Sequence, residues 1–307
     1  MGATSTFAVA TLVPPSSMRS AGRIDFAGAT LLGFGLLLPL VAISQTPVWG
    51  WGSLKTISLI AAGAIVLVRF VRHEQSHPEP LIDMKTLSRP QIALTNLSTL
   101  FVGFGMFGAS FIMIQFLEQP VSTGYGSGSS ATQAGLFLVP GTALMLLTAP
   151  LCGYLASRTG PKTALVLGAG LAGSALAFLA FFNQGLFYLY LWPTMLYVGI
   201  GFAFAAMPML ILNAVEPSQR GQATATNQIF RLVGSTIGTQ LAATFIAASV
   251  GHSGQPTEEG FRRAFIAEAL GGFAAVLAAF AIPRLRRTTP QDISPPPDSI
   301  VAGTVSI

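Results

Sequence analysis

Charged residues are scarce in this 307-residue chain, at 9% of the sequence against the roughly 25% usual in soluble proteins. The chain has a single cysteine, Cys152, which excludes an intrachain disulfide and a cysteine-rich metal site. Apolar residues reach 51%, and the mean hydropathy is +0.64. This composition excludes a soluble globular protein and indicates an integral membrane protein.

Eight apolar runs are long enough to cross a bilayer, which takes about 20 residues for roughly 30 Å of hydrocarbon. They are too long and too uniformly apolar for membrane β-strands, which alternate in polarity over about 10 residues. Helices also satisfy the backbone hydrogen bonds within lipid. We therefore predict an all-α, polytopic membrane protein with about eight transmembrane helices, at residues 26–43, 54–71, 92–117, 134–156, 164–182, 186–212, 223–248 and 265–282.

The positive charges of the connections favour one orientation. The net charge of +5 does not require nucleic acid, because membrane proteins gather Lys and Arg in their cytoplasmic loops. With both termini in the cytoplasm, 12 of the 16 Lys and Arg residues lie inside, three lie outside (Lys55, Arg262 and Arg263), and Arg231 lies within a span. We predict a multi-pass plasma-membrane protein with this topology. The 12 are Arg19, Arg23, Arg69, Arg72, Lys85, Arg89, Arg158, Lys162, Arg220, Arg284, Arg286 and Arg287.

The chain divides into five parts. Residues 1–25 contain a short apolar run at 5–13 that ends at Pro14, and we interpret them as the stub of a missing helix and its cytoplasmic connection. The other parts are a two-helix transmembrane insert at 26–72, a polar cytoplasmic linker at 73–91, a six-helix unit at 92–283 and a disordered cytoplasmic tail at 284–307.

The segment HEQSH at residues 73–77 matches the H-E-x-x-H pattern of zinc proteases. On a helix, His73 and His77 would share a face and Glu74 would serve as general base, so an intramembrane zinc protease is one alternative. The segment lies outside the apolar span, however, and Pro78 and Pro80 follow it directly. We therefore favour a polar stretch beside the membrane, and predict no metal site and no enzymatic activity.

Two G-x-G-x-x-G matches begin at Gly103 and Gly168. Both lie inside apolar spans and neither belongs to a βαβ unit, so dinucleotide binding is excluded in favour of close helix packing. Gly234 and Gly238 form a G-x-x-x-G pair with the same interpretation. No nucleotide or other cofactor is predicted.

The connection between the spans at 134–156 and 164–182 carries the most informative motif. It reads Gly153-Tyr-Leu-Ala-Ser157-Arg158-Thr-Gly160-Pro161-Lys162, a tight hairpin whose two cations can meet lipid headgroups or helix C-terminal carbonyls. It resembles the G-x-L-a-D-R-x-G-r-K loop of the major facilitator superfamily. Ser157 replaces the acid and Pro161 a basic residue, as is usual in the C-terminal half of that family.

Further segments resemble one branch of the family, the 14-helix drug:proton antiporters. Residues 23–28 resemble the start of that branch's two inserted helices, Trp49-Gly50-Trp51 the loop between them, and residues 79–83 the link to its C-terminal half. The resemblance covers roughly residues 5–283. It implies a C-terminal six-helix half preceded by a two-helix insert, with the first six helices absent. The chain is thus expected to be part of a proton-coupled multidrug efflux transporter and incomplete alone.

Polar residues within or beside the spans are the candidates for coupling or counter-charge, because charges inside a membrane are costly. Arg231 lies about 12 Å into its predicted span, with Asn227 and Gln228 one turn away. It is either a counter-charge for a proton-carrying acid or an anionic substrate group, or a structural arginine. Glu118 lies at the end of its span. It is either a proton site or a solvated carboxylate at the membrane interface, and the second interpretation is the simpler one. Glu268 is expected in a surface ion pair with Arg262 or Arg263.

A semi-polar stripe at helical spacing follows the span at 92–117, and we interpret it as one wall of a substrate cavity rather than a helix seam. The family places a second wall on the span at 186–212, where Pro193 and Pro208 are candidate kinks. Aromatic rings there can hold lipophilic cations. The predicted cavity residues are Asn96, Thr99, Met106, Ser110, Met113, Trp192, Tyr197, Phe204 and Met207, beside Gly103 in the stripe and Asn213 at the end of the second span.

The expected partners are the lipid bilayer, protons, a small lipophilic or cationic substrate, and a separate N-terminal six-helix half; nucleic acid is not among them. A non-transporting membrane partner subunit is the second alternative, beside the zinc protease.

Overall fold

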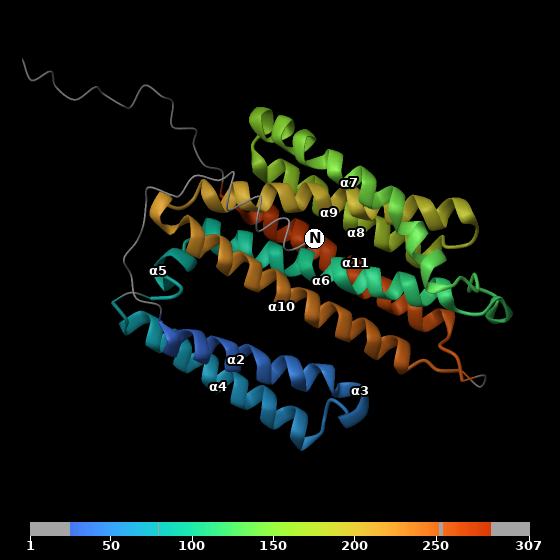
Figure 1. The fold of residues 1–307 in the computed structure, drawn as a ribbon, viewed down its shortest axis with the longest axis horizontal. Helices are drawn as coiled ribbons and strands as arrows, with labels where there is room; N and C mark the ends of the chain where they lie inside the picture. Colours follow the sequence, from blue (N-terminus) through green and yellow to red (C-terminus); the bar gives the residue numbers. More distant parts are fainter. Residues whose placement is uncertain (1–24, 79, 252–253, 284–307) are drawn as a thin grey trace, which may run out of the picture.

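The structure is a computed structural model that describes residues 25–78, 80–251 and 254–283. In these residues eight helices are long and apolar enough to cross a membrane, which confirms the predicted all-α fold. They are α2 (Phe26–Ser44), α4 (Leu54–Ser76), α6 (Pro90–Glu118), α7 (Ala131–Thr159), α8 (Pro161–Phe181), α9 (Leu186–Leu212), α10 (Arg220–Ala247) and α11 (Glu258–Ala281) (Figure 1). The expected helix stub at 5–13, the tail at 284–307 and the cations Arg19, Arg23, Arg284, Arg286 and Arg287 lie outside the described residues.

Local signals set where the helices begin and end. Ser130 and Gln133 form a capping box at the start of α7, and the Ser53 hydroxyl caps α4. Between α7 and α8, Gly160 adopts a φ of 91°, which favours glycine, and Pro161 then occupies the first turn of α8. These turn and cap residues explain why most boundaries lie close to the predicted spans.

Most helices run a few residues past the predicted spans, and two of them, α11 and α4, extend furthest. α11 begins at Glu258 rather than at residue 265, because the Thr257 side chain caps it and its charged first turn continues the helix past the apolar stretch. α4 continues to Ser76 rather than ending at residue 71, so the first four residues of the predicted 73–91 linker are helical. The same linker holds the one-turn helix α5 (Met84–Leu87). Hydropathy marks the part of a helix that suits lipid, whereas the hydrogen-bonded helix includes polar end turns.

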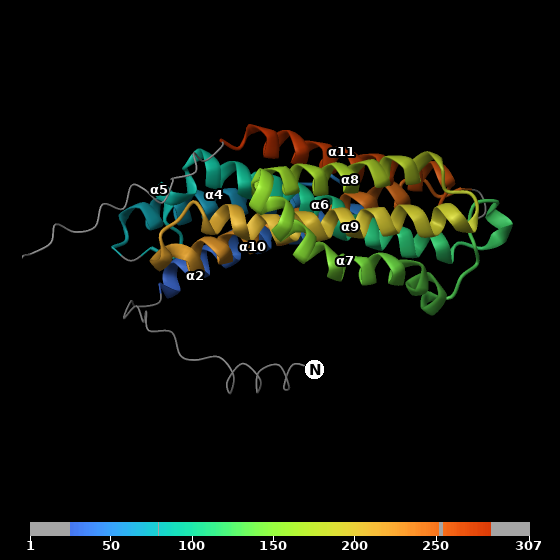
Figure 2. The same ribbon diagram turned by 90° about the horizontal axis from the view of Figure 1, so that it is seen from above.

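Six of the helices pack into one bundle. α6 lies against α10 and α11, α8 against α9 and α11, and α7 against α9. α2 and α4 form a separate pair, joined by the short helix α3 (Thr46–Trp49), and this pair lies beside α10 (Figures 1 and 2). The described helices thus form a two-helix pair followed in the chain by a six-helix bundle.

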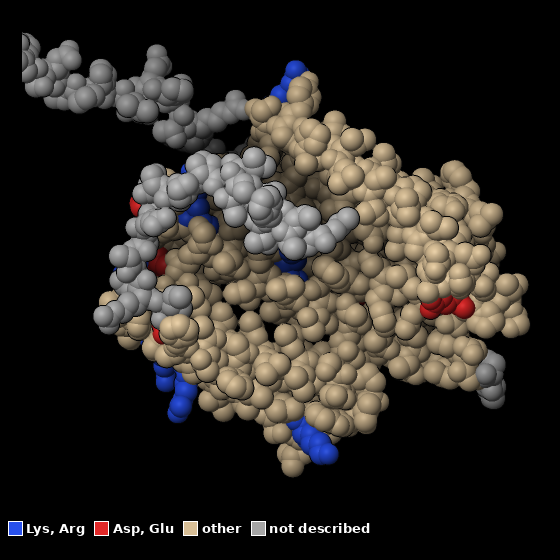
Figure 3. All heavy atoms as spheres, viewed as in Figure 1, with Lys and Arg blue, Asp and Glu red and all other residues tan. Residues whose placement is uncertain are grey.

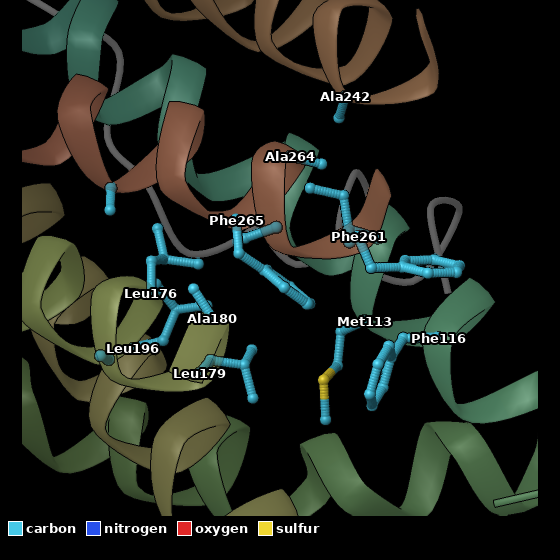
Figure 4. Packing of buried hydrophobic residues seen from close by; sticks show 14 of the residues in the cluster. Met113, Phe116, Leu176, Leu179, Ala180, Leu196, Ala242, Phe261, Ala264 and Phe265 are labelled. Carbon is cyan, nitrogen blue, oxygen red and sulfur yellow. The ribbon is translucent and has the colours of Figure 1, made fainter. Parts of the chain in front are cut away.

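The bundle is held by close packing of aromatic and aliphatic side chains, the interaction available to helices that are already in lipid. Phe116 of α6 meets the rings of Phe261 and Phe265 of α11 edge to face, with centroids 5.4 and 6.1 Å apart. Met113 and Leu179 lie in the same buried cluster, between α6 and α8 (Figure 4). This cluster fixes α11 against the centre of the bundle.

The outer surface is apolar. Leu146 of α7 and Leu270 of α11 are 79% and 63% exposed, and both lie near the middle of their helices. Figure 3 shows that uncharged residues cover most of the face in view, and that Lys, Arg, Asp and Glu appear on it only as a few separate patches. An uncovered apolar surface of this extent is stable in a bilayer and not in water.

The helices alternate in direction, so their connections gather at two ends. One end, called here the Lys162 end, holds the start of α2, the link from α4 to α6, the α7–α8 turn, the α9–α10 turn and the end of α11. Its described cations are Arg69, Arg72, Lys85, Arg89, Arg158, Lys162 and Arg220, whereas the opposite end has Lys55, Arg262 and Arg263.

Candidate functional site

Arg231 places a cation in the middle of α10. It is the twelfth residue of that helix, about 16 Å from its start at 1.5 Å per residue. Its side chain is half-buried, and the guanidinium carbon lies 4.6 Å from the centroid of the Phe204 ring on α9. In the described part of the chain, no carboxylate lies within ion-pair distance of it. The cation is therefore held by an aromatic face, and its charge remains available.

One turn before Arg231, Asn227 joins α10 to α6. Its Nδ2 donates to Asn96 Oδ1 and to Thr99 Oγ1, each at 2.8 Å, and all three residues are buried. Two members of the predicted stripe thus lie in the seam between α6 and α10. Gln228, the next residue of α10, is exposed, as is Glu118 at the end of α6.

Glycines bring α6 and α10 into backbone contact along this seam. A side chain on Gly103 would collide with the Arg231 carbonyl, and side chains on Gly234 and Gly238 would collide with the backbone carbonyls of Leu100 and Phe104. Small residues permit this approach between membrane helices, as the G-x-x-x-G spacing predicts. The seam fixes the depth and direction of Arg231.

The other predicted cavity residues lie in several parts of the bundle. Met106, Ser110, Tyr197 and Phe204 are half-buried, and the Ser110 hydroxyl lies 3.1 Å from the Tyr197 hydroxyl, which links α6 to α9. Met113 and Met207 are buried inside the bundle in two separate core clusters. Trp192 is half-buried near the start of α9, where its indole N–H donates to the Phe182 carbonyl at 2.7 Å. Asn213 directly follows the end of α9.

Glu268 of α11 is a functional candidate that the sequence interpretation missed. It is fully buried, and neither carboxyl oxygen has a hydrogen-bond partner in the described structure. The carboxyl group lies against Gly108 of α6, where a side chain would collide with it. The expected surface ion pair with Arg262 or Arg263 is wrong, because Glu259 binds both of those arginines. Glu268 lies six residues after Arg262 and five after Arg263, on another face of the helix.

The predicted loop motif ties the α7–α8 hairpin to α11. Lys162 donates from Nζ to the Phe280 carbonyl at 2.7 Å and to the Ile282 carbonyl at 2.5 Å, at the C-terminal end of α11. Arg158 stacks over the ring of Tyr154, 4.6 Å from its centroid, and is exposed. Gly153 is half-buried in the last turns of α7. The motif therefore connects three helices at one end of the bundle.

The link between α4 and α6 is bound to the start of α10. Gln222 donates to the carbonyls of Pro80 and Leu81 at 2.8 and 2.6 Å. The Thr86 hydroxyl donates to Asp83 at 2.6 Å, and this bond lowers the pKa of the Asp83 carboxyl. A hollow beside these residues reaches Asn96 from the Lys162 end.

Comparisons with known proteins agree on one family. The sequence model of the Major Facilitator Superfamily matches residues 1–239 and 96–302. The chain is 25% identical over 235 residues to the tetracenomycin C resistance and export protein of Streptomyces glaucescens. This alignment covers 76% of this chain and 43% of that protein. It is 26% identical over 256 residues to a multidrug resistance protein B homolog of Mycobacterium tuberculosis, covering 81% of this chain and 46% of that protein.

A comparison of the fold with solved structures also finds a membrane transporter. The structure is similar to a crystal structure of the nucleoside transporter NupG, carrying a D323A mutation, with a TM-score of 0.52 and 16% identity over 80% of this chain and 65% of that one. The chain spans less than half the length of the curated relatives named above. The family match covers more than half of the chain, so this chain belongs to the major facilitator superfamily of membrane transporters and is not an enzyme.

Proposed function

We propose that this chain forms one wall of the substrate path of a proton-coupled drug efflux transporter in the plasma membrane. The printed names of two relatives, an export protein and a multidrug resistance protein, support efflux of a small lipophilic or cationic substrate. Since the chain spans less than half of those relatives, a complementary set of helices supplies the other wall. The zinc-protease alternative is wrong, because the chain belongs to a transporter family.

The observation that carries the proposal is the half-buried Arg231, which has an aromatic contact and no described acid partner. An unpaired cation in the middle of a membrane helix is costly unless it faces water or an anion. Arg231 therefore faces the substrate path, as a counter-charge for an acidic group of the complementary helices or of the substrate. Phe204, Tyr197, Ser110 and Met106, which are also half-buried, complete this face.

Glu268 is the proposed proton-carrying group of the chain. A buried carboxyl group without a partner is far less costly in its protonated form, so gain or loss of the proton changes how α6 and α11 pack. α6 contacts the carboxyl group of Glu268 through Gly108 and the backbone of Arg231 through Gly103. A shift of α6 therefore links the protonation of Glu268 to the position of Arg231.

Deletion of the coding sequence for this chain in the organism that makes it tests the proposal. The deletion strain should retain a fluorescent lipophilic cation, and the intact gene should restore energy-dependent efflux that a protonophore abolishes. Unchanged efflux in the deletion strain would contradict a role in export. If complementation succeeds equally with the wild-type and Arg231→Ala chains, the chain supports transport only as a partner subunit.

The proposed orientation places the Lys162 end in the cytoplasm, as the gathering of described cations at that end supports. Single cysteines introduced beside Lys162 and Arg220 should react with a membrane-impermeant maleimide in inside-out vesicles and not in intact cells. Reaction of both from outside intact cells would reverse the topology.

A further inference from the structure

Two histidines lie together at the Lys162 end of α4. His73 is in the last turn of the helix and His77 follows its end, four residues later, so both project to the same side. Their rings are 5.2 Å apart between centroids. A pair of imidazoles at this spacing is a common half of a zinc site.

Asp25 brings a carboxylate to the same place from the start of α2. Its Oδ1 accepts the Gly28 N–H at 2.8 Å, which caps the helix, and its Oδ2 lies 2.8 Å from His73 Nε2. The Gly28 N–H, assisted by His73, lowers the pKa of this carboxyl group. One potential ligand atom from each of Asp25, His73 and His77 lies within 4.8 Å of the other two. Figure 1 shows the two helix ends side by side.

A second acid points into the same corner. Glu74 is only 3% exposed; its Oε2 accepts the Ile82 N–H at 2.9 Å, whereas its Oε1 is buried with no partner among the described residues. A side chain on Gly28 would collide with the carboxylates of both Asp25 and Glu74. A cation at this place would give the buried Glu74 Oε1 a partner and offset the negative charge of the neighbouring Asp25 carboxylate.

We propose that Asp25, His73 and His77 bind a divalent transition-metal ion of the Zn²⁺ type, which ties the start of α2 to the end of α4, with Glu74 beside it. Two imidazoles and a carboxylate suit Zn²⁺ and not Mg²⁺ or Ca²⁺, which take oxygen ligands. Asp25 Oδ2 and His73 Nε2, 2.8 Å apart, are close enough to share one ion. A movement of the half-exposed His77 side chain would bring its nitrogen to the usual zinc–nitrogen distance of about 2.0–2.1 Å.

The role of this ion is structural. Glu74 anchors the backbone of the α4–α6 link through Ile82, and its burial removes it from the position of a general base in contact with water. The His73 side chain is 31% exposed, so solvent gives the ion access. The metal would hold the two-helix pair closed at the end where it joins the six-helix bundle.

The test is zinc binding by the full chain, purified through a tag without histidines and stripped with a chelator. Titration against a chromogenic zinc indicator should give one tightly bound Zn²⁺ per chain. His77→Gln and Asp25→Asn should weaken binding by about tenfold or more. Asn keeps the helix cap of α2, and circular dichroism checks that both variants fold. His252→Ala, which removes the third histidine of the chain, should bind as the wild type does.

Thermal unfolding supplies a second measurement. Added Zn²⁺ should raise the melting temperature of the wild type and of His252→Ala, and leave that of His77→Gln unchanged. A wild type that binds no zinc, or His77→Gln and Asp25→Asn variants that bind it as tightly as the wild type, would overturn the proposal.

Discussion

Arg231 of α10 holds its guanidinium carbon 4.6 Å from the centroid of the Phe204 ring of α9. The contact joins two helices that are otherwise in limited contact, since α10 packs mainly on α6 and α9 mainly on α7 and α8. The Phe204 ring stabilises the cation without neutralising it. We therefore propose that an anion is received at this pair.

Replacement of Arg231 should affect transport more than replacement of an exposed arginine. We expect Arg231→Ala to lower efflux by about tenfold or more, and Arg231→Lys to recover part of it, because lysine restores the charge but not the planar stacking. Arg263→Ala is the matched control, since Arg263 is exposed in an ion pair with Glu259. Equal efflux by Arg231→Ala and Arg263→Ala, at equal membrane levels, would remove Arg231 from the substrate path.

Glu268→Gln should fold and insert normally but uncouple transport from the proton gradient. Glutamine has nearly the shape of a protonated glutamic acid, so it mimics one of the two proposed states and cannot reach the other. The measurement is the dependence of dye efflux on pH, which the variant should lose. Glu259→Gln, which alters an exposed carboxylate, should keep the wild-type profile. An unchanged profile for Glu268→Gln would rule out Glu268 as the proton carrier.

Gly234→Ala should destabilise the chain, because the added methyl group would collide with the Leu100 carbonyl of α6. Overpacking of this kind costs about 1–3 kcal/mol, measurable as a lower melting temperature in detergent. Gly135→Ala is the control, since the site has open space and alanine favours a helix by about 0.5–1 kcal/mol. A Gly234→Ala chain as stable as Gly135→Ala would show that the helices can separate at no cost.

Asn227→Ala should destabilise the α6–α10 seam by about 1–3 kcal/mol, because it leaves Asn96 and Thr99 buried without their donor. Gln228→Ala, at the neighbouring exposed position, should change the melting temperature little. If the two alanine variants unfold at the same temperature, the hydrogen bonds of the seam contribute no net stability.

The sequence predicts the fold well because hydrocarbon imposes a strong requirement on each span. Apolar runs located all eight helices, and the errors lie at polar end turns such as Glu258 and Ser76, where lipid exerts no selection. The depth of Arg231 also follows from its position in a span. These are local properties of the chain.

Relations between distant residues were not predictable in the same way. The stripe that contains Asn96 and Thr99 has helical spacing, but only the fold shows that its neighbour is Asn227. Glu268 lies near two arginines in sequence, and its face of α11 was not evident from that proximity. Asp25 reaches His73 across 48 positions, a contact that the HEQSH segment alone does not reveal.

The central claim is that the face around Arg231 borders a water-filled path and not lipid. It is tested by single cysteines in a Cys152→Ser background, placed at Gln228, one turn from Arg231, and at the exposed Leu146 near the middle of α7. Maleimide reacts with thiolates, which require water. We predict that a water-soluble maleimide labels Gln228→Cys, that a transported substrate slows this labelling, and that Leu146→Cys stays unlabelled. Equal lack of reaction at the two positions would contradict the account.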